Sequence, residues 1–593
     1  MSPPINNSKL AHIGSARKDE EISGNLCRWV FSNPFTRNGR VAAQEPAVAQ
    51  GRHALATINP NTPLMVDGTT GISFTWQDVY QASLSLAAGI IQLPLRPPRT
   101  PRATEPQTGA VVLVCLPNCI QFPIALFGIL SAGYTVTMAS TGLTATELTT
   151  IIEESRTQLV FTTPENRPKI REALAIIKST SIPIYTISPD SPDLNNMPRT
   201  HADNSWQELM LDPLVEPIRM DYAQASQHVA VILWSSGTSG KPKGIIMTHQ
   251  AFIASIVSLW HVNPHFSEGE RWMGVVPFYH IFGLFEPTTF LDMIPKHAIT
   301  CLHMAPPVAL LMAKNTALRA QDFASVRNAL CGGAPVAWNV VESIHKRLGL
   351  QIRMGYGLSE AGSVSNQVVL HGDISDHKGH VGIPLYGVEL KITDTSNANI
   401  TVAVGNPGRI LVRSGGMMKG YLDEPKKTRE ALDEDGWFDT GDLGIIDEKG
   451  RLHITGRLKD VIKVRGFQVS PAELEDIILA LPFVADVAVA AVCHEERGTE
   501  LPRAYVVPTD TQLRLGLCNG QTDAAKLLPL GQDIRACVEK STIHYKWLKG
   551  NIVFLDSIPK SLAGKILRKD LSDKLGVLCC IYEDGLGKRT ANL

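Results

Sequence analysis

The chain has 593 residues, of which 44% are hydrophobic and 19% are charged, and its formal net charge at pH 7 is -1. A chain of this length is too long for one hydrophobic core, so we expect two or more domains. The balanced charge lacks the basic excess of a general nucleic-acid-binding protein and argues against that class. Ten cysteines without paired C-x-x-C spacing indicate neither a zinc site nor a disulfide scaffold, and they favour a reducing compartment.

The polar residues 1–24 predict a disordered tail, and the Pro- and Arg-rich residues 96–108 predict a surface insertion. The basic residues of the tail are followed by no apolar run, so the tail does not have the pattern of a secretory signal. At the other end, residues 591–593 (A-N-L) are only distantly similar to a peroxisomal address. We therefore expect a cytoplasmic protein, with the peroxisome as the alternative.

Strands and helices alternate in the first third of the chain. The apolar pattern predicts strands over 111–116 and 158–162 and helices over 120–132 and 165–177. This alternation indicates mixed α/β layers. The most apolar stretch, 110–139, is interrupted by prolines and polar residues, so no membrane span is expected.

Residues 235–244 read S-S-G-T-S-G-K-P-K-G and combine small hydroxyls, glycines and lysines. Such a loop suits phosphate, because glycine lets the backbone approach a polyanion, hydroxyls donate hydrogen bonds and lysine neutralises charge. A strand is predicted over 228–234 and a helix from Thr248 onward. The spacing is not that of a Walker A loop. A Gly/Ser surface loop without a ligand is the alternative.

Two later motifs combine a glycine-containing turn with a carboxylate. Residues 355–360 read G-Y-G-L-S-E, in which the Tyr356 ring could stack on a nucleobase and Glu360 could hold Mg²⁺. Residues 437–442 read W-F-D-T-G-D and place Asp442 at a strand end, where it suits ribose hydroxyls. An ordinary turn is the alternative in both cases.

Two basic motifs follow. Residues 457–468 read R-L-K-D-V-I-K-V-R-G-F-Q, for which a solvated strand face is the default. Residues 559–568 read P-K-S-L-A-G-K-I-L-R and place Lys565 after glycine in a loop before a predicted helix. The pattern is β-rich after residues 405–408, and a smaller α/β unit begins near residue 457. We therefore expect a large domain over 25–457 and a small one over 458–593.

Together and in this order, the five motifs resemble those of the adenylate-forming superfamily, and most of all the 4-coumarate–CoA ligase-like acyl-CoA synthetases. The resemblance covers about residues 25–577. Residues 277–280 (P-F-Y-H) and 331–335 (C-G-G-A-P) are also similar to family segments at the adenine and acyl sites. The resemblance implies an α/β fold: a large N-terminal domain of layered sheets and helices, and a small mobile C-terminal α+β lid.

The resemblance also implies a reaction in two steps, with ATP, Mg²⁺ and CoA as co-substrates. A carboxylic acid attacks the α-phosphorus of ATP to give acyl-AMP and pyrophosphate, and a thiol then attacks the acyl carbonyl. The lid is expected to rotate about Lys459 between the steps. The rotation withdraws Lys565 and brings Gly466 near a pantetheine tunnel.

The residues carried over from the family fall into groups by role. Those expected at the phosphates are Ser235, Ser236, Gly237, Thr238, Ser239, Gly240 and Lys243. Those expected at adenine and ribose are Gly333, Ala334, Gly355, Tyr356, Gly357, Ser359, Asp442 and Arg457. Thr238 and Glu360 are expected to place Mg²⁺. The catalytic set is Lys565, which bridges the carboxylate and the α-phosphate, with His280, Lys463 and Gln468.

The acid and its acceptor stay open. Gly332 and Gly333 remove bulk beside a mostly apolar wall of Cys331, Ser363 and Val364, which suits an aromatic, arylpropenoic or medium-chain acid. The acceptor is CoA or, in the alternative, a carrier protein.

The chain departs from the family pattern after Leu284, where roughly 20 residues are missing, about one short helix and one strand. We expect the loss to lower stability, and a transcript that contains the extra segment to exist. A non-catalytic nucleotide-binding descendant is the third alternative.

Overall fold

The computed structural model describes residues 25–27, 30, 61–95, 108–179, 181–189, 204–212, 214–236, 242–262, 269–274, 287–334, 336–367, 374–465, 467–494, 498–520, 524–560, 566–571 and 576–579. The predicted tail over 1–24 and nearly all of the insertion over 96–108 lie outside these residues. Short 3-10 helices cover Trp206–Leu209, Ala320–Phe323, Ile374–His377, His544–Lys546 and Arg568–Leu571.

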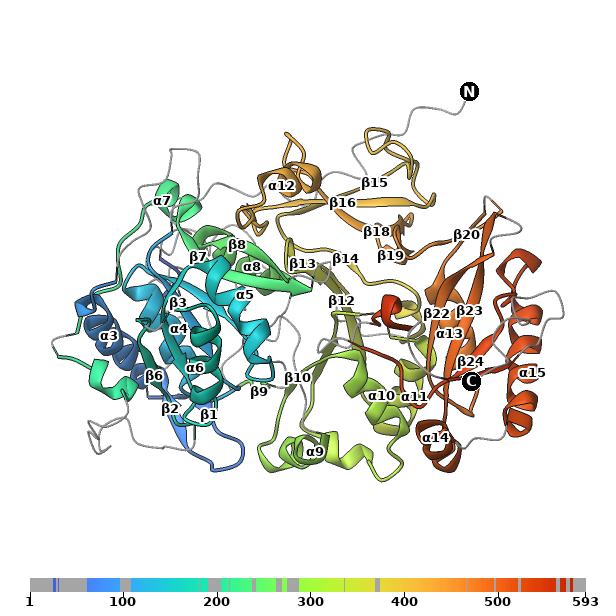
Figure 1. The fold of residues 1–593 in the computed structure, drawn as a ribbon, viewed down its shortest axis with the longest axis horizontal. Coiled ribbons are helices and arrows are strands. Elements are labelled where there is room, and N and C mark those ends of the chain that lie inside the picture. Colours follow the sequence, from blue (N-terminus) through green and yellow to red (C-terminus); the bar gives the residue numbers. More distant parts are fainter. Residues whose placement is uncertain are drawn as a thin grey trace.

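A seven-stranded sheet forms the first part of the chain (Figure 1). Its strands are, in spatial order, β17 (Gly420–Tyr421), β8 (Pro242–Thr248), β7 (Val229–Ser236), β4 (Thr135–Met138), β3 (Val111–Cys115), β5 (Thr157–Thr162) and β6 (Ile184–Thr186). The helices around it are α3 (Trp76–Gln92), α4 (Phe122–Ser131), α5 (Ala145–Ser155), α6 (Arg167–Ile176), α7 (Tyr222–Gln227) and α8 (His249–Val262). A hairpin of β1 (Pro63–Val66) and β2 (Ser73–Thr75) precedes them. Strand β3 is buried along its whole length, as expected for a strand covered on both faces.

The elements predicted in the first third of the chain are confirmed, since β3, α4, β5 and α6 begin and end within two residues of the predicted bounds. The prediction of a loop over 235–244 was wrong at both ends, because Ser235 and Ser236 are the last residues of strand β7. Residues 242–244 do not continue a loop but open strand β8, which pairs antiparallel with β7. The residues from Gly244 to the end of β8 are buried, and burial of the apolar ones among them favours this pairing.

A six-stranded sheet forms the second part. Its order is β14 (Ile383–Pro384), β13 (Gly362–Asn366), β12 (Ile352–Leu358), β11 (Asn328–Cys331), β10 (Cys301–Met304) and β9 (Trp272–Met273). Strands β9 to β12 are parallel, whereas β12, β13 and β14 are antiparallel. Helices α9 (Pro287–Lys296), α10 (Pro306–Lys314) and α11 (Trp338–Leu348) accompany this sheet, and its core includes Ile344 and Ile352.

The β-rich pattern predicted after residue 405 is confirmed as an antiparallel sheet. It consists of β15 (Val388–Thr393), β16 (Gly408–Ser414), β18 (Phe438–Ile446) and β19 (Leu452–Arg457), and α12 (Pro425–Ala431) lies beside it.

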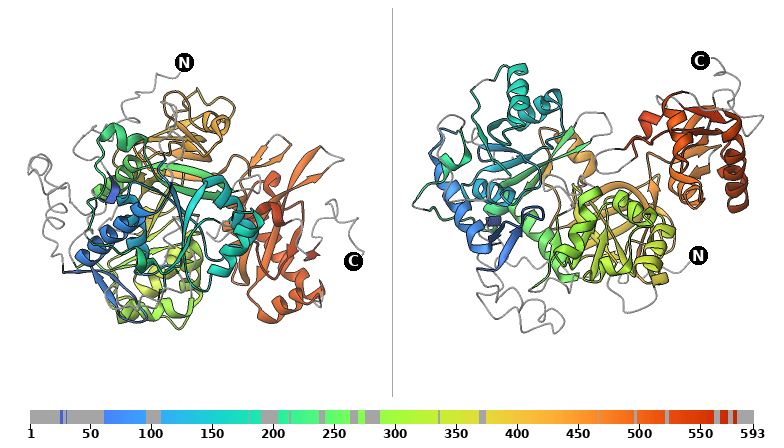
Figure 2. Two further views of the ribbon diagram at one scale, coloured as in Figure 1. Left: turned by 60° about the vertical axis from the view of Figure 1, so that its left-hand side comes forward. Right: turned by 90° about the horizontal axis from the view of Figure 1, so that it is seen from below.

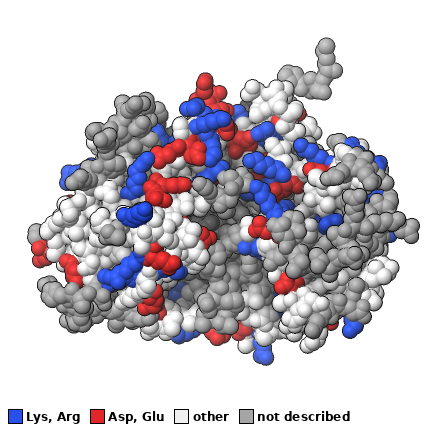
Figure 3. Space-filling model, viewed as in Figure 1, with Lys and Arg blue, Asp and Glu red and all other residues white. Residues whose placement is uncertain are grey.

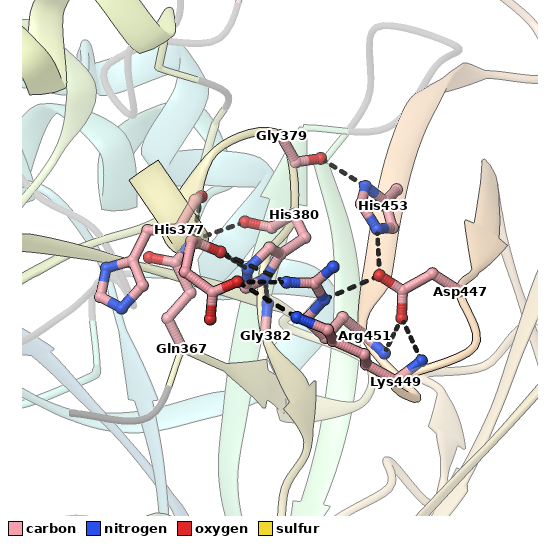
Figure 4. A network of polar contacts seen from close by, with 10 residues as sticks. Gln367, His377, Gly379, His380, Gly382, Asp447, Lys449, Arg451 and His453 are labelled. Carbon is pink, nitrogen blue, oxygen red and sulfur yellow. Dashed lines mark hydrogen bonds and ion pairs between the residues drawn. The ribbon is translucent and has the colours of Figure 1, made fainter. Parts of the chain in front are cut away.

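The turn that joins β18 to β19 is held by a network of charged contacts (Figure 4). His453 contacts Asp447 Oδ2 through Nε2 and the Gly379 carbonyl through Nδ1, both at 2.9 Å. Arg451 donates to Asp447 at 2.7 Å and to Asp376 at 3.0 Å. The network anchors the turn end of the β18–β19 hairpin to residues 376–379. The opposite end of the hairpin therefore extends from an anchored turn.

The C-terminal part has its own core, which includes Val489, Val506 and Phe554. Its elements are β20 (Ile462–Val464), β21 (Phe467–Val469), α13 (Pro471–Leu479), β22 (Val484–His494), β23 (Thr499–Pro508), α14 (Thr511–Cys518), α15 (Ala524–Ser541), β24 (Ile552–Phe554) and β25 (Val577–Cys579). In the right-hand view of Figure 2 this part stands to one side of the rest of the chain. Lys314 bridges the two parts by donating to the Ala485 carbonyl at 2.5 Å.

On the face drawn in Figure 3, Lys and Arg side chains lie among Asp and Glu side chains, so the described part of this face has mixed charge. Within the residues that the structure describes, no helix combines the length and the apolarity needed to cross a bilayer.

Candidate active site

The motif over 355–360 forms the tip of the β12–β13 hairpin. Tyr356 and Gly357 lie on β12 with a bulge between them, and Glu360 lies in the turn. Glycine is needed at 357, because a Cβ there would lie 2.5 Å from the Gly362 carbonyl oxygen across the hairpin. The hairpin therefore carries two of the predicted ligand residues, Tyr356 and Glu360, four positions apart.

Tyr356 belongs to a cluster, centred on the buried Asp442, with two residues that the resemblance assigns to ribose. Its hydroxyl donates to Asp442 Oδ2 at 2.7 Å, and Arg457 Nε lies 3.1 Å from Asp442 Oδ1. Asp442 and Arg457 face each other on β18 and β19. Burial, and then the nearby Asp442 carboxylate, raise the pKa of Tyr356, so its phenol stays protonated and donates. The structure thus joins three predicted residues that are up to 101 positions apart in sequence (457 − 356).

The two arms of the predicted phosphate loop are paired strands. Ser235 faces Lys243 and Ser236 faces Pro242 at the loop end of the β7–β8 hairpin. Residues 237–241, which include Gly237, Thr238, Ser239 and Gly240, join these ends and lie outside the described residues. Their predicted contacts with phosphate stay a prediction.

Tyr421 on β17 is a residue that the sequence analysis missed. Its hydroxyl donates to Glu360 Oε1 at 3.3 Å, and Lys243 Nζ lies 5.3 Å from the centre of its ring. Strand β17 pairs with β8, which brings Tyr421 beside the strand that leaves the phosphate loop. No local pattern marks this position, because the neighbourhood is created by strand pairing across more than 170 residues (421 − 245 = 176).

Gly333 and Ala334 follow strand β11, and Gly333 has φ of 90°, a conformation that suits glycine. Of the wall expected around the acid, Cys331 and Val364 are fully buried. His280 and Leu284 lie outside the described residues, so the catalytic role of His280 and the effect of the missing segment stay predictions.

In the C-terminal part, Lys463 and Gln468 face each other on the β20–β21 hairpin. The Glu500 carboxylate accepts from the Lys463 backbone N–H at 2.7 Å and so holds this hairpin on β23. Gly466, at the tip, lies outside the described residues.

Lys565 also lies outside the described residues, but the loop that carries it has a defined base. Lys560 and Ile566 form an isolated bridge, and the Leu567 N–H donates to the Pro559 carbonyl at 2.9 Å. Arg568 then contacts the Glu475 carboxylate at 2.6 Å. The helix predicted after this loop is, within the described residues, a single 3-10 turn over Arg568–Leu571.

Among the described residues, no group of three or more His, Cys, Asp and Glu side chains could hold a metal ion. The described cysteines are free thiols. A surface hollow between α6 and β6, lined by Arg167, Arg171 and Ile184 among others, contains none of the predicted site residues.

The chain matches two protein-family models. One, described as AMP-binding enzyme, matches residues 53–422. The other, described as AMP-binding enzyme C-terminal domain, matches residues 473–565.

Curated relatives match most of the chain. The 4-coumarate--CoA ligase 3 of Arabidopsis thaliana is 30% identical over 538 residues, which cover 86% of this chain and 88% of the relative. The 4-coumarate--CoA ligase 2 of Petroselinum crispum is 30% identical and the match covers 86% of this chain and 91% of the relative.

Solved structures share the fold. The anthranilate CoA ligase AuaEII in complex with anthranoyl-AMP matches with a TM-score of 0.72 and 21% identity, over 90% of this chain and 98% of that chain. ATP-bound MatB from Rhodopseudomonas palustris matches with a TM-score of 0.70 and 23% identity, over 88% of this chain and 98% of that chain.

Proposed function

The chain belongs to the AMP-binding enzyme family, and from that premise we propose that it is an ATP-dependent acid–CoA ligase. In the first step a carboxylate oxygen of the acid attacks the α-phosphorus of ATP, acyl-AMP forms and pyrophosphate leaves. In the second step the thiol of CoA attacks the acyl carbonyl, the thioester forms, AMP leaves and the thiol proton is released. The domains proposed for these steps are 25–457 and 458–593.

The observation that carries the proposal is the joint placement of Tyr356 and Glu360 on one hairpin. The Tyr356 hydroxyl donates to Asp442, which also contacts Arg457. Glu360 accepts from the Tyr421 hydroxyl, and the Tyr421 ring lies beside Lys243. Four strand positions span at most about 13 Å, at about 3.3 Å per residue. A group of residues suited to a nucleoside and a group suited to phosphates thus lie within the reach of a single nucleotide.

The proposed roles follow from the charges of the two steps. Two anions approach each other in the first step, so positioned cations and backbone donors are the main source of rate. We assign Lys243 and the residues of the 235–240 loop to the β- and γ-phosphates, and Lys565 to the approach of the carboxylate to the α-phosphate. Lys463 and Gln468 are assigned to the second step, with Gly466 beside the pantetheine arm.

The residues at the hairpin tip fit Mg²⁺ held together with a nucleotide. Glu360 is a carboxylate with only one oxygen engaged by Tyr421 among the described contacts. Mg²⁺ in nucleotide sites is bound through one or two carboxylates or hydroxyls plus phosphate oxygens, so a complete protein cage is not required. Glu360 and Thr238 would hold the ion, which neutralises phosphate charge when bound.

For the acid, we propose a flat aromatic or arylpropenoic substrate. The support is the 30% identity to two 4-coumarate--CoA ligases over most of both chains. A medium-chain acid is the alternative for the substrate, and a carrier protein is the alternative for the acceptor. A non-catalytic nucleotide-binding role is the alternative for the whole protein. For the location we propose the cytoplasm, with the peroxisome as the alternative.

The test is ATP–pyrophosphate exchange with a panel of aromatic, arylpropenoic and aliphatic acids, followed by thioester analysis with CoA. The proposal predicts acid-dependent exchange and a CoA thioester with at least one aromatic or arylpropenoic acid. Exchange without a CoA product would favour the carrier-protein alternative. Absence of exchange with every acid would contradict the proposal and favour the non-catalytic role.

A further inference from the structure

A short segment, residues 418–422, joins the two groups of residues in the candidate site. The Met418 N–H donates to the Glu360 carbonyl at 2.8 Å. Three residues on, Tyr421 pairs with Ile245 of β8, and the Leu422 N–H donates to the Gly244 carbonyl at 2.8 Å. The segment therefore connects the tip of the β12–β13 hairpin with the strand that leaves the phosphate loop.

The side chain of Tyr421 lies between two residues of opposite charge. Its hydroxyl is 3.3 Å from Glu360 Oε1, and its ring is within the range of a cation–π contact with Lys243 Nζ. Burial, and then the charge of Glu360, raise the pKa of Tyr421. The phenol therefore stays protonated and donates to the carboxylate.

Hydrogen bonds and close packing fix the backbone that carries this side chain. The Tyr421 N–H donates to Thr428 Oγ1 at 2.9 Å, and Thr428 Oγ1 in turn donates to the Glu424 carbonyl at 3.0 Å. Gly420 has φ of 154°, and a Cβ at this position would lie 2.9 Å from Thr428 Cγ2. Strand β17 thus fits closely against α12, which sets the position of the Tyr421 backbone between β8 and this helix.

We propose that Tyr421 is a positioning residue that keeps Glu360 and Lys243 apart and aims both at the nucleotide phosphates. This inference rests on the proposed function. A neutral hydroxyl leaves the carboxylate its full charge and its second oxygen, and an aromatic face leaves the ammonium its N–H donors. A direct ion pair between Glu360 and Lys243 would neutralise both charges, and neither would then be available to the nucleotide. In the described part of the chain, Glu360 Oε1 and Lys243 Nζ each contact Tyr421, and no ion pair joins the two residues.

The experiment is calorimetric binding of ATP, with and without Mg²⁺, to the wild-type protein, Tyr421→Phe and Tyr421→Leu. Tyr421→Phe removes only the hydroxyl, so it should weaken ATP binding about 2- to 10-fold when Mg²⁺ is present and leave binding without Mg²⁺ unchanged. Tyr421→Leu also removes the ring beneath Lys243, so it should weaken binding in both conditions. The matched control is Tyr134→Phe, which changes a tyrosine that packs against the same core but is not among the site residues, and this variant should bind ATP as the wild type does.

Three results separate the possible failures. Equal ATP affinity of Tyr421→Phe and the wild type in both conditions would overturn the positioning role. So would an equal loss in both conditions together with a lower melting temperature, because that pattern indicates a structural role alone. If the wild type binds ATP and the variants behave as expected, but no acid supports pyrophosphate exchange, the positioning role stands and the proposed ligase function fails.

Discussion

At the scale of single residues, Asp442 is the carboxylate through which distant parts of the chain meet. Its two oxygens contact the Tyr356 hydroxyl and the Arg457 guanidinium, and it is 5% exposed. Burying a carboxylate is costly unless charged or polar partners replace water. The cluster satisfies that requirement and at the same time fixes the Tyr356 ring on β12.

Lys565→Ala tests the residue assigned to the first chemical step. Loss of a cation that acts where two anions approach should slow acyl-AMP formation by roughly 10²-fold or more. Thioester formation from supplied acyl-AMP should survive. Pyrophosphate exchange and thioester formation from acyl-AMP measure the two steps separately, with Lys569→Ala as the charge control. An equal loss in both steps would contradict the assignment.

The sequence could predict those site residues that belong to a short local motif. Tyr356, Asp442 and Arg457 each belong to a short run of glycine, carboxylate or cation, and the structure places all three together. Tyr421 could not be found in this way. Its position depends on the pairing of β17 with β8, and nothing in its own neighbourhood encodes that partner.

At the scale of elements, the β12–β13 hairpin depends on one close approach. A Cβ at position 357 would meet the Gly362 carbonyl oxygen at 2.5 Å, whereas the nearest atom to a Cβ at position 355 is Leu330 Cδ1 at 3.5 Å. Backbone cannot give way as a flexible side chain can. The two glycines of the same motif therefore differ in what they tolerate.

We predict that Gly357→Ala destabilises the protein by about 1–3 kcal/mol, the usual cost of overpacking, and weakens ATP binding. Gly355→Ala is the matched control for packing and should be close to neutral in thermal stability. Thermal melting and ATP calorimetry check the pair. Equal effects of the two substitutions would show that the close approach does not govern the hairpin.

The β18–β19 turn gives a prediction for the dependence of stability on pH. Burial opposes ionisation of Asp447, but the His453 hydrogen bond and the Arg451 contacts outweigh it and lower the pKa of Asp447 below its ordinary value of 3.8. A lowered pKa means that the contribution of Asp447 to stability is complete above this value. It is lost as the pH falls from 3.8 toward the folded-state pKa.

Asp447→Asn should therefore reduce the free energy of unfolding by roughly 1.5–3 kcal/mol at neutral pH, as expected for hydrogen bonds to a charged group. The difference from the wild type should shrink below pH 3.8. Urea unfolding at both pH values checks this, with Glu448→Gln as a charge control in the same turn. A difference that does not change with pH would show that the carboxylate charge is not what holds the turn.

The strands and helices that the sequence predicted share one property. The patterns over β3, α4, β5 and α6 are periodic and bounded by turn residues, so local physics is enough. Strand β8 was missed because the glycine- and lysine-rich motif runs into it without a break. Its first residues become strand only through pairing with β7.

At the scale of the whole molecule, the chain passes from the third sheet to the C-terminal part through the turn at 457–461. The N–H groups of Asp460 and Val461 both donate to the Arg457 carbonyl at 3.1 Å. Lys459 lies between Arg457 and Asp460 in this turn. The α/β class and the division into a large and a small part were expected from the resemblance, whereas the order of strands within each sheet needed the structure.

Lys459→Pro tests whether this turn is the hinge between the two steps. Proline fixes φ and should restrict rotation of the C-terminal part. Thioester formation should fall more than acyl-AMP formation, whereas Lys459→Ala should leave both steps close to the wild type. The two half-reactions measured on one preparation check this. A proline variant with both steps intact would place the hinge elsewhere.

The measurement that tests the ligase proposal most directly is the fate of a carboxylate oxygen. The protein is incubated with ATP, CoA and an accepted acid labelled with ¹⁸O in its carboxylate, and the nucleotide product is analysed by mass spectrometry. Attack on the α-phosphorus predicts AMP that carries one ¹⁸O atom per thioester formed, with unlabelled pyrophosphate. Unlabelled AMP, or ¹⁸O in inorganic phosphate together with ADP, would contradict the adenylate route.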